Sequence, residues 1–481
     1  MLDKNLSEGR PEFEIVCLED FIPKDHLLRK IKKYVDFSFI YDIVSHLYSP
    51  NTGRPAIDPI LLIKMLLVGY LYGIRSERQL EQEIKVNMAY RWFLGLGISG
   101  KVPHHSTISF NRVKRFQGTT VFQDIFDRIV EQAVEHGLIE GRVLFTDSTH
   151  LKANGNKKKY TKEQVAETTK EYIDELDRAV DLDRKAHGKK TLSEKKRKPV
   201  KETLQLPLEE KSTEEHTLSK APKYEAQTIP KREIKISTTD TESGYMYREV
   251  KPEGFFYLDH RTVDFKYNFI TDVHITAGNV HDSVPYLSRL ERQKTRFGFK
   301  IEAVALYAGY LGSALCHGLL TAKIFAVIGH RRFSGVKGMF LKRKYRYDAP
   351  RDCYECPAGE ELRYRTTTRE GYREYVSNPE KCRVCEFLNQ CTHSKNNRKV
   401  ITRHVWSDSI EEIRRNRLSP EGKRLYKARS QTIERSFADA KELHGYRYCR
   451  FRGRERVQEQ ALLTTGAQNI KKMACILSNK G

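Results

Sequence analysis

The chain has 481 residues, a formal net charge of +23 and 39% hydrophobic residues. This length can bury one large core with insertions, or two to three domains, so the fold does not need disulfides. The longest apolar run, Ile60 to Ile74, is interrupted by Lys64, and the N-terminus lacks the apolar centre of a signal peptide, so we expect a cytoplasmic protein with no membrane segment.

Positive charge is concentrated in the last third of the chain. Residues 331–481 contain 35 Lys and Arg against 18 Asp and Glu, so they account for 17 of the 23 net charges. Within them, residues 447–456 (RYCRFRGRER) place arginines beside Tyr448 and Phe451. A solvated basic surface would favour lysine and spread its charge evenly, whereas arginine beside aromatic rings suits phosphate and base contacts. The charge therefore predicts a nucleic-acid partner.

Residues 1–140 have the pattern of several helices. A capping box at residues 76–79 begins an apolar face that continues to Trp92, and a second helix covers residues 121–134. Between them, residues 105–115 (HSTISFNRVKR) predict a short basic helix. Such a group is typical of a DNA-binding module, and a plain packing or dimerisation bundle fits the pattern equally well.

The pattern changes after Gly141. Residues 143–145 predict a buried strand that ends at Asp147, and residues 154–233 form a charged insertion with few large apolar residues. Within this insertion we expect a helix over residues 161–181, followed by a solvated linker at residues 189–220.

Strand patterns return at residues 254–276, which predict a hairpin, and a helix follows at residues 284–295. The run from Ile301 to Leu306 predicts a further buried strand that ends at Tyr307. A helix and a strand at residues 324–328 come next. Mixed strands followed by alternating strands and helices predict an α/β sheet flanked by helices.

A basic, cysteine-bearing insertion occupies residues 331–400, and a final long helix follows it. Ser419 caps this helix, Pro420 lies in its first turn, Gly445 stops it, and Glu434 lies near its middle.

The insertion contains two Cys-x₂-Cys knuckles separated by 25 residues. Two such knuckles supply four thiolates, which is the ligand set of a closed tetrahedral zinc site. The expected ligands are Cys353, Cys356, Cys382 and Cys385, with Cys391 or His393 as a replacement for one of them. Reduced thiols without a metal are the alternative. The other four cysteines (Cys17, Cys316, Cys449 and Cys475) look isolated and buried.

Four long stretches of sequence resemble transposases of bacterial insertion sequences, in which an N-terminal helical domain precedes an RNase H-like catalytic domain. The stretches are DPILLIKMLLVGYLYGIRSERQLEQEI from Asp58, FTDSTHLKANGNK from Phe145, YLDHRTVDFKYNFITDVHITAGNVHDS from Tyr257, and TIERSFADAKELHGYRYCRFRG from Thr432. The resemblance implies an RNase H-like mixed sheet flanked by helices, and a cysteine-rich, zinc-ribbon-like insertion interrupts it here. The implied domains are a helical DNA-binding or dimerisation domain (1–140), the first part of the catalytic core (141–330), the cysteine-rich insertion (331–400) and the rest of the core (401–481).

The resemblance also implies a DDE site. Asp147 is its first Asp and Glu434 its Glu, while Tyr307, in VALYAGY, stands where the family has its second Asp. Carboxylates brought together from strand ends and a helix can hold two Mg²⁺ or Mn²⁺ ions, which activate the incoming oxygen and stabilise the leaving one in phosphodiester cleavage. By spacing alone, Asp147 is read as a turn residue and Glu434 as a solvated surface charge.

Tyr307 cannot simply replace an aspartate, because a phenol with a pKa of about 10 is neutral at pH 7 and offers one oxygen. We expect this chain to bind DNA and to cleave it poorly or not at all. Asp272, Asp282 and Asp348 do not lie in a strand-end context and are not expected to rescue the site. The other interpretation makes Tyr307 a tolerated core aromatic, with the true acid elsewhere.

Further DNA contacts are expected near the helix that carries Glu434. Lys441 lies two turns after Glu434 on the same helical face, which suits a phosphate contact, although a solvated lysine fits as well. Tyr426 and Arg429 complete the family's Tyr, Arg, Glu, Lys signature, with one extra residue between Arg and Glu. The remaining basic candidates are Arg447, Arg450 and Arg452. Trp406 is interpreted as a core residue rather than a stacking platform.

The predicted function is that of a transposase. It would bind the terminal inverted repeats of its element and target DNA, as a homodimer in the DNA complex, and it would be nucleoid-associated. One alternative is a catalytically inactive, DNA-binding derivative. A weaker one is an RNase H-like nuclease that acts on RNA or hybrids, which salt-dependent binding to DNA ends and to hybrid duplexes would distinguish.

Overall fold

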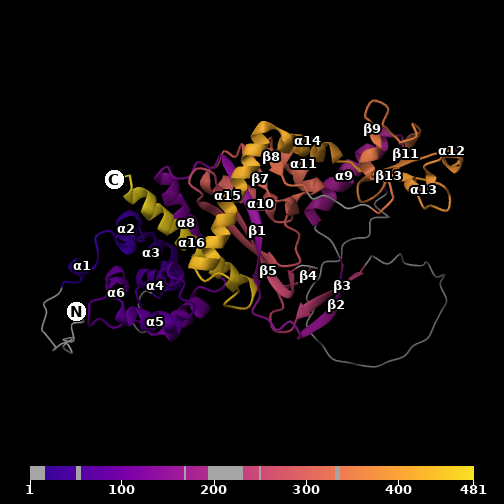
Figure 1. The fold of residues 1–481 in the computed structure, drawn as a ribbon. Helices are drawn as coiled ribbons and strands as arrows, with labels where there is room; N and C mark the ends of the chain where they lie inside the picture. The colour runs from indigo at the N-terminus through magenta and orange to yellow at the C-terminus, as the bar shows by residue number, and fades with distance from the viewer. Residues whose placement is uncertain are drawn as a thin grey trace, which may run out of the picture.

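The computed structural model describes most of the chain as one body with a smaller lobe beside it (Figure 1). The described residues are 17–49, 56–166, 170–192, 231–248, 251–330 and 336–480. None of the helices within them combines the length and the apolar character that a bilayer-spanning segment needs.

The N-terminal part of the described chain is helical, as the sequence predicts. Its helices are α1 (Leu18–Phe21), α2 (Leu27–Tyr34), α3 (Phe39–Val44), α4 (Pro59–Leu71), α5 (Glu77–Val86), α6 (Met88–Leu94), α7 (His105–Phe110) and α8 (Val121–Glu135). The Ser76 half of the expected capping box is present, because the Ser76 hydroxyl accepts a hydrogen bond from the Gln79 N–H. The single helix expected to run on to Trp92 is wrong, since Asn87 ends α5 and its side chain caps α6.

A mixed sheet forms the centre of the molecule. Its strands are β1 (Val143–Lys152), β4 (Gly244–Arg248), β5 (Lys251–Asp264), β6 (Ile270–Ala277), β7 (Ala303–Leu306) and β8 (Phe325–Ile328). Strand β5 lies between β1 and the predicted hairpin partner β6, and it pairs antiparallel with both. On its other side β1 pairs parallel with β7, which pairs parallel with β8. The expectation of an α/β sheet is confirmed.

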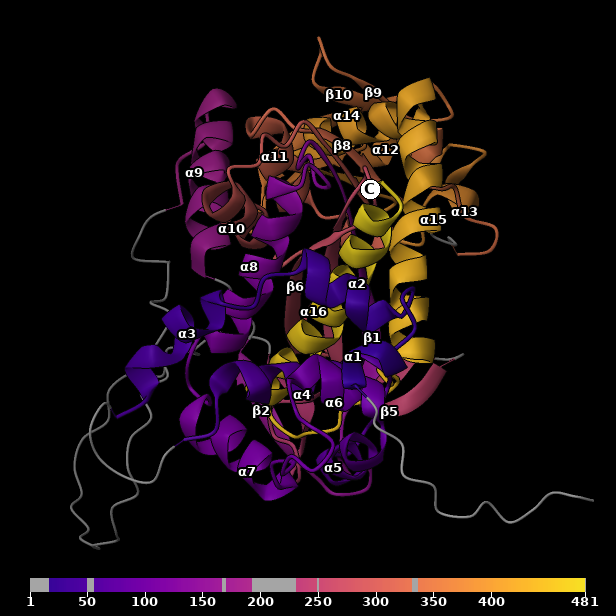
Figure 2. The same ribbon diagram turned by 90° about the vertical axis from the view of Figure 1, so that its left-hand side faces the viewer.

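Helices cover both faces of this sheet. Successive residues of a strand point to opposite faces, so neighbouring residues of β1 pack against different helices. On one face Leu144 packs with α10 (Tyr286–Phe297), α11 (Ser313–Thr321) and α14 (Ser407–Leu418). On the other face Phe145 packs with Leu425 of α15 (Pro420–Leu443). Figure 2 shows α15 on the opposite side of the sheet from α10 and α11.

A second long helix, α16 (Arg454–Ser478), follows α15, so the expectation that α15 is the final helix is wrong. Helix α16 packs against α2, α4, α8 and β6 (Figures 1 and 2). Its glycine Gly466 lies against Ile129 of α8, and 15 of its residues are buried. It carries many Gln, Thr and Ala residues, which give a weak apolar stripe in the sequence. One hydrophobic core therefore runs across residue 140, from the N-terminal helices to the central sheet.

The charged insertion contains more strand than expected. Residues 160–166 form β2 (Tyr160–Ala166), which pairs with β3 (Lys231–Ser237), so the predicted helix start at residue 161 is wrong. Helix α9 (Lys170–Ala186) follows. The pairing with β3 is a contact across the whole insertion, which local sequence cannot reveal. Most of the predicted linker lies outside the described residues.

The lobe is a five-stranded antiparallel sheet. Its elements are β9 (Arg346–Asp348), β10 (Cys353–Glu355), β11 (Glu361–Thr367), β12 (Tyr372–Val376), α12 (Pro379–Arg383), α13 (Leu388–Cys391) and β13 (Val400–His404). A small aromatic core around Tyr354 and Tyr375 holds it together. Helix α9 joins it, because Asp183 binds Arg373. Trp406 is buried against α9 and stacks on His317 at 4.8 Å, so its interpretation as a core residue is confirmed.

Candidate functional site

The predicted acids lie near the point where the pairing of β1 with β7 ends. The last parallel pair is Thr146 with Leu306, and Asp147 is the next residue of β1. Strand β1 continues to Lys152 along β5, so Asp147 lies inside a strand and not at its end. Asp147 lies two residues after Phe145, so its side chain points to the same face of the sheet, which α15 covers.

Arg429 of α15 connects the two predicted carboxylates. Its Nη1 donates to Asp147 Oδ2 at 2.8 Å, and its Nη2 lies 3.3 Å from Glu434 Oε1. The Arg429 side chain is only 4% exposed, whereas that of Glu434 is 58% exposed. The structure thus brings Asp147 and Glu434 to one guanidinium, although they lie in distant parts of the sequence.

Tyr307 directly follows β7 and faces the same arginine. The Arg429 guanidinium carbon lies 5.7 Å from the centre of the Tyr307 ring and 5.1 Å from that of Tyr426. Tyr307 is 41% exposed, so the alternative that it is a core aromatic is wrong.

Helix α15 holds its side chains in place through a well-defined start and a buried stripe. The Ser419 hydroxyl accepts from the Gly422 N–H, and Pro420 fits the first turn because that position needs no donor. Leu425, Ile433 and Phe437 anchor the helix in the core. The helix ends at Leu443, and Gly445 has a φ of +65°, as the predicted stop requires.

Burial controls the charge of Asp147. It raises the pKa of the carboxyl to about 6, the Arg429 guanidinium and the Ser148 N–H oppose this increase, and the Asp282 carboxylate adds to it. The paired guanidinium therefore favours an ionised Asp147 at neutral pH, as a bound cation would.

Asp282, which was not expected to lie at the site, is a neighbour of Asp147. Its Oδ1 accepts a hydrogen bond from the Ser148 hydroxyl at 2.8 Å, beside Asp147. Asp282 follows β6 in a loop, and only the tertiary structure brings that loop to the middle of β1. The other two excluded acids are bound elsewhere, Asp272 by Arg289 and Asp348 by Arg351.

The predicted DNA-contacting side chains differ in what they bind within the protein. Lys441 Nζ donates to Thr149 Oγ1 at 2.8 Å, two residues along β1 from Asp147. Arg447 pairs with Glu442 on the surface. Arg450 stacks on Tyr70 at 4.5 Å, and Arg452 Nε donates to the Asn154 carbonyl at 3.0 Å. The arginine and aromatic pattern of this segment thus also serves to dock α15 and α16 on the N-terminal helices.

The predicted zinc ligands do not all come together. Cys356, Cys382, Cys385 and Cys391 line one cavity in the lobe, and Cys353 is not among its lining residues. Cys353 is buried at 3% exposure within β10. Of the four cysteines expected to be isolated and buried, Cys316 and Cys449 are buried, Cys475 is half-buried, and Cys17 is exposed, so that expectation is wrong for Cys17.

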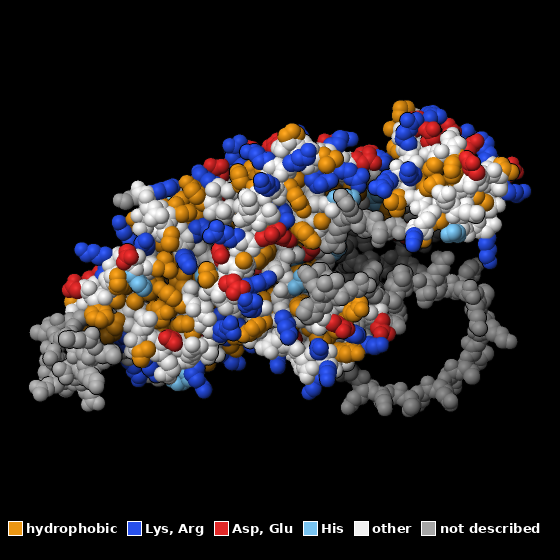
Figure 3. Space-filling model, in the orientation of Figure 1, with side chains coloured by type: hydrophobic (Ala, Val, Ile, Leu, Met, Phe, Trp, Pro, Cys, Tyr) orange, Lys and Arg blue, Asp and Glu red, His pale blue; other side chains and the backbone are white. Residues whose placement is uncertain are grey.

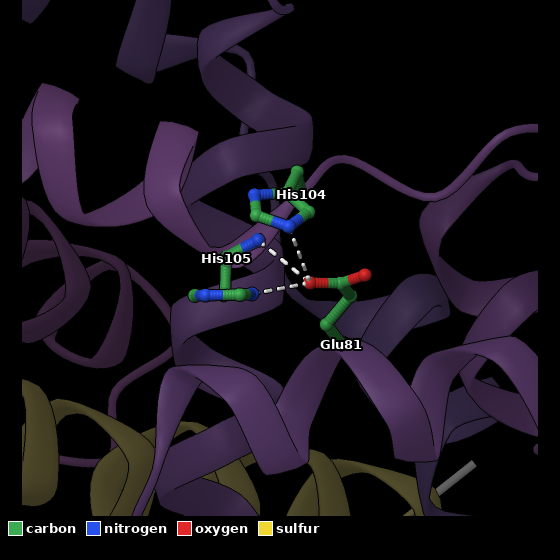
Figure 4. A group of neighbouring side chains, drawn as sticks. All are labelled: Glu81, His104 and His105. Carbon is green, nitrogen blue, oxygen red and sulfur yellow. Dashed lines mark hydrogen bonds and ion pairs between the residues drawn. The ribbon is translucent and has the colours of Figure 1, made fainter.

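A compact Glu and His group lies in the N-terminal helices and was not predicted. Within the described ranges it is the group of three or more His, Cys, Asp or Glu whose ligand atoms all lie within 4.8 Å. Figure 4 shows His104 and His105 turned toward one oxygen of Glu81. That oxygen accepts from the His105 N–H at 2.8 Å, and the other pairs with Lys85 at 2.7 Å. Because these contacts satisfy the carboxylate, the group acts as a cap that ties α5 to the first turn of α7.

Two family models match the chain. Residues 16–114 match a transposase domain (DUF772), and residues 355–474, which include Glu434, match a transposase DDE domain. No curated protein and no solved structure gives a significant match. Together the two matches place the chain among the DDE transposases, which are enzymes of DNA recombination. Within that class it belongs to the transposases of insertion sequences.

Proposed function

We propose that this transposase binds the terminal inverted repeats of an insertion sequence and catalyses metal-dependent cleavage and strand transfer of DNA. The observation that carries the proposal is the convergence of Asp147 and Glu434 on Arg429. The Asp147 carboxylate balances the buried charge of Arg429, and the exposed Glu434 adds little to that pair. Two carboxylates at one place also suit catalysis, because phosphodiester chemistry needs oxygen ligands for divalent ions.

The architecture supports an RNase H-like catalytic core. The central sheet is antiparallel on one side of β1 and parallel on the other, and helices cover both faces. This agrees with the mixed, helix-flanked sheet that the family resemblance implies. We extend the proposal to the domains: a helical domain (1–140), a core in two parts (141–330 and 401–481) and an inserted lobe (331–400). Helix α16 connects the second part of this core to the helical domain, because it packs against β6 as well as against α2, α4 and α8.

The donor set fits one divalent cation better than two. Asp147 and Glu434 already share one cationic group, and Mg²⁺ or Mn²⁺ is commonly held by one or two carboxylates, with waters and substrate phosphate as further ligands. The metal supplies activation of the attacking oxygen and stabilisation of the leaving one. Tyr307 adds a neutral phenol where a third carboxylate would complete a clamp for two ions. With Asp147 and Glu434 holding a metal, the Arg429 guanidinium would be available to donate to a phosphate oxygen.

DNA is the polyanion that the basic surface suits. Figure 3 shows Lys and Arg side chains on both the main body and the lobe, with Asp and Glu among them. The support for DNA is the excess of positive charge in residues 331–481. Lys441 lies next to β1 close to the acids, where it can bind the scissile strand's phosphate. Synapsis of two element ends requires two copies of the chain, so we propose a homodimer in the DNA complex.

The test is cleavage of a DNA fragment that carries both ends of the chain's own element, with Mg²⁺ or Mn²⁺, alongside a gel-shift assay of binding. Asp147→Asn and Glu434→Gln are each made in the parent and in the Tyr307→Asp variant. In whichever background cleaves, they are expected to lose at least 100-fold in cleavage rate while binding stays within about threefold. Arg435→Met, an exposed arginine on the same helix, is the control that should cleave as the parent does.

Tyr307→Asp separates the two candidate functions. If the site is impaired by the missing carboxylate, the variant cleaves at least tenfold faster than the parent. A parent that binds but does not cleave, together with an active Tyr307→Asp variant, identifies the inactive DNA-binding derivative. Equal cleavage by both proteins would refute the impaired-site hypothesis. Full cleavage by Asp147→Asn would refute the catalytic assignment itself.

A further inference from the structure

The outer part of the lobe has little to hold it in place. Helices α12 and α13 are five and four residues long, and neither contains a buried residue. Isolated helices of this length are not stable in water. The segment nevertheless lies against the sheet, where Lys381 pairs with Glu360 and the Phe340 N–H donates to the Gln390 carbonyl. Surface contacts of this kind contribute little, so a cross-link here would add stability to the segment.

Four cysteines converge at the place where this segment meets the sheet. Cys356 follows β10, Cys382 lies in α12, Cys385 comes just after it, and Cys391 ends α13. All four line one cavity, whose other walls include Phe340, Leu362 and Phe387. Thiol groups gathered from three separate turns in an apolar pocket are typical of a structural metal site.

The backbone at these cysteines has the turns that such a site uses. The Cys385 N–H donates to the Cys382 carbonyl at 3.2 Å, which closes the Cys-x₂-Cys turn. The Gly359 N–H donates to the Cys356 carbonyl at 2.9 Å, and Gly359 has a φ of +79°, which favours glycine. These two turns bring Cys356 from one segment and Cys382 and Cys385 from another to the same cavity.

We propose that Cys356, Cys382, Cys385 and Cys391 bind one structural Zn²⁺, and that Cys353 takes no part. On binding, the four thiols release their protons to solvent and form four Zn–S bonds of about 2.3 Å. The resulting double negative charge lies beside two lysines that also line the cavity, Lys381 and Lys399. The metal fastens α12 and α13 to the sheet.

The side chains need a small rearrangement to close around the ion. Among the described residues no three cysteines have their sulfurs within 4.8 Å of one another. Cys382 donates to the Ser377 hydroxyl at 3.2 Å, and Cys391 lies 3.0 Å from the Tyr345 hydroxyl. Rotation of these two side chains about χ1 exchanges one hydrogen bond each for a metal bond. Cys353 cannot join by rotation, because its position in β10 lies between β9 and β11.

The first experiment measures zinc in the full chain, purified under reducing conditions and reconstituted with ZnSO₄. We expect one zinc per chain, and a Co²⁺-substituted sample should show the intense absorption of tetrahedral thiolate ligation. Serine variants at Cys356, Cys382, Cys385 and Cys391 should each bind zinc at least tenfold more weakly. Cys353→Ser is the matched control and should keep its zinc. A zinc-free parent after reconstitution, or a Cys353→Ser variant that loses zinc while Cys391→Ser keeps it, would overturn the proposal.

A second measurement needs no variant, in case the substitutions prevent folding. Iodoacetamide labelling of the parent, mapped by mass spectrometry, should spare the four cavity cysteines when zinc is bound and modify them after chelation. The exposed Cys17 should be modified in both states and reports that the reagent is active. Equal labelling of the four cysteines with and without chelator would contradict the site.

Discussion

The stability lost on removal of Arg429 tests whether Asp147 and Glu434 meet at this residue, without any assay of catalysis. The Arg429 and Asp147 side chains are 4% and 12% exposed and lie 2.8 Å apart. Arg429→Met keeps the aliphatic stem but leaves the Asp147 carboxylate buried without its cation. Loss of one partner of a buried pair costs about 3 to 5 kcal/mol. The second pair, to the 58% exposed Glu434, adds at most about 1 kcal/mol. We therefore expect a loss of about 3 to 5 kcal/mol in the free energy of unfolding.

The assay is equilibrium unfolding in urea at pH 7 with EDTA, so that no divalent ion can replace the guanidinium. Arg435→Met is the matched control, because Arg435 is 79% exposed on the same helix and contacts Asp439 only at 3.9 Å. It should cost no more than about 0.5 kcal/mol.

A double-mutant cycle then assigns the loss to the pair. In Asp147→Asn with Arg429→Met the buried charge is gone, so the double variant should lose less than the two single losses added together, by about 1 to 3 kcal/mol. If Arg429→Met costs no more than the control, or if the two losses simply add, Asp147 and Arg429 do not form the pair on which the site depends.

Two further predictions concern parts of the fold away from the acids. Burial raises the pKa of Glu459 to about 8, so the folded chain holds a proton there that the unfolded chain releases near pH 4.5. The stability contributed by this proton is complete below pH 4.5 and is lost as the pH rises through 8. Between pH 6 and pH 8, the free energy of unfolding of Glu459→Gln should therefore decrease by about 2 kcal/mol less than that of the parent. Identical pH profiles for variant and parent would contradict this. Gly141 and Gly137 have φ values of +66° and +65°, but a Cβ at Gly141 would lie 2.3 Å from Phe299 Cγ, whereas one at Gly137 meets nothing within 4 Å. Gly137→Ala should cost about 1 kcal/mol and Gly141→Ala about 1 to 3 kcal/mol more, measured by urea unfolding; equal losses would show that Phe299 moves aside freely.

Much of the local structure follows from sequence because its causes are local. The cap at Ser419, the stop at Gly445 and the apolar spacing of α15 are read within one helix. The strand that ends before Tyr307 and the hairpin of β5 and β6 are similarly set by short runs of β-forming residues. Helix α16 and strand β2 escaped prediction for the opposite reason. Their partners, α8 and β3, lie far away in the chain, so tertiary packing overrides a weak local pattern.

By itself the sequence determined the positions of Tyr307 and Glu434 in their elements, the strand that carries Asp147 and the presence of a thiol-rich insertion, because residue types and their spacing carry that information. The tertiary structure alone decided which side chains meet. It joined the two acids through Arg429, brought Asp282 beside Asp147, and gathered Cys391 in place of Cys353. Contacts of this kind depend on how strands and helices far apart in the chain pack against one another. A local sequence pattern does not encode that packing.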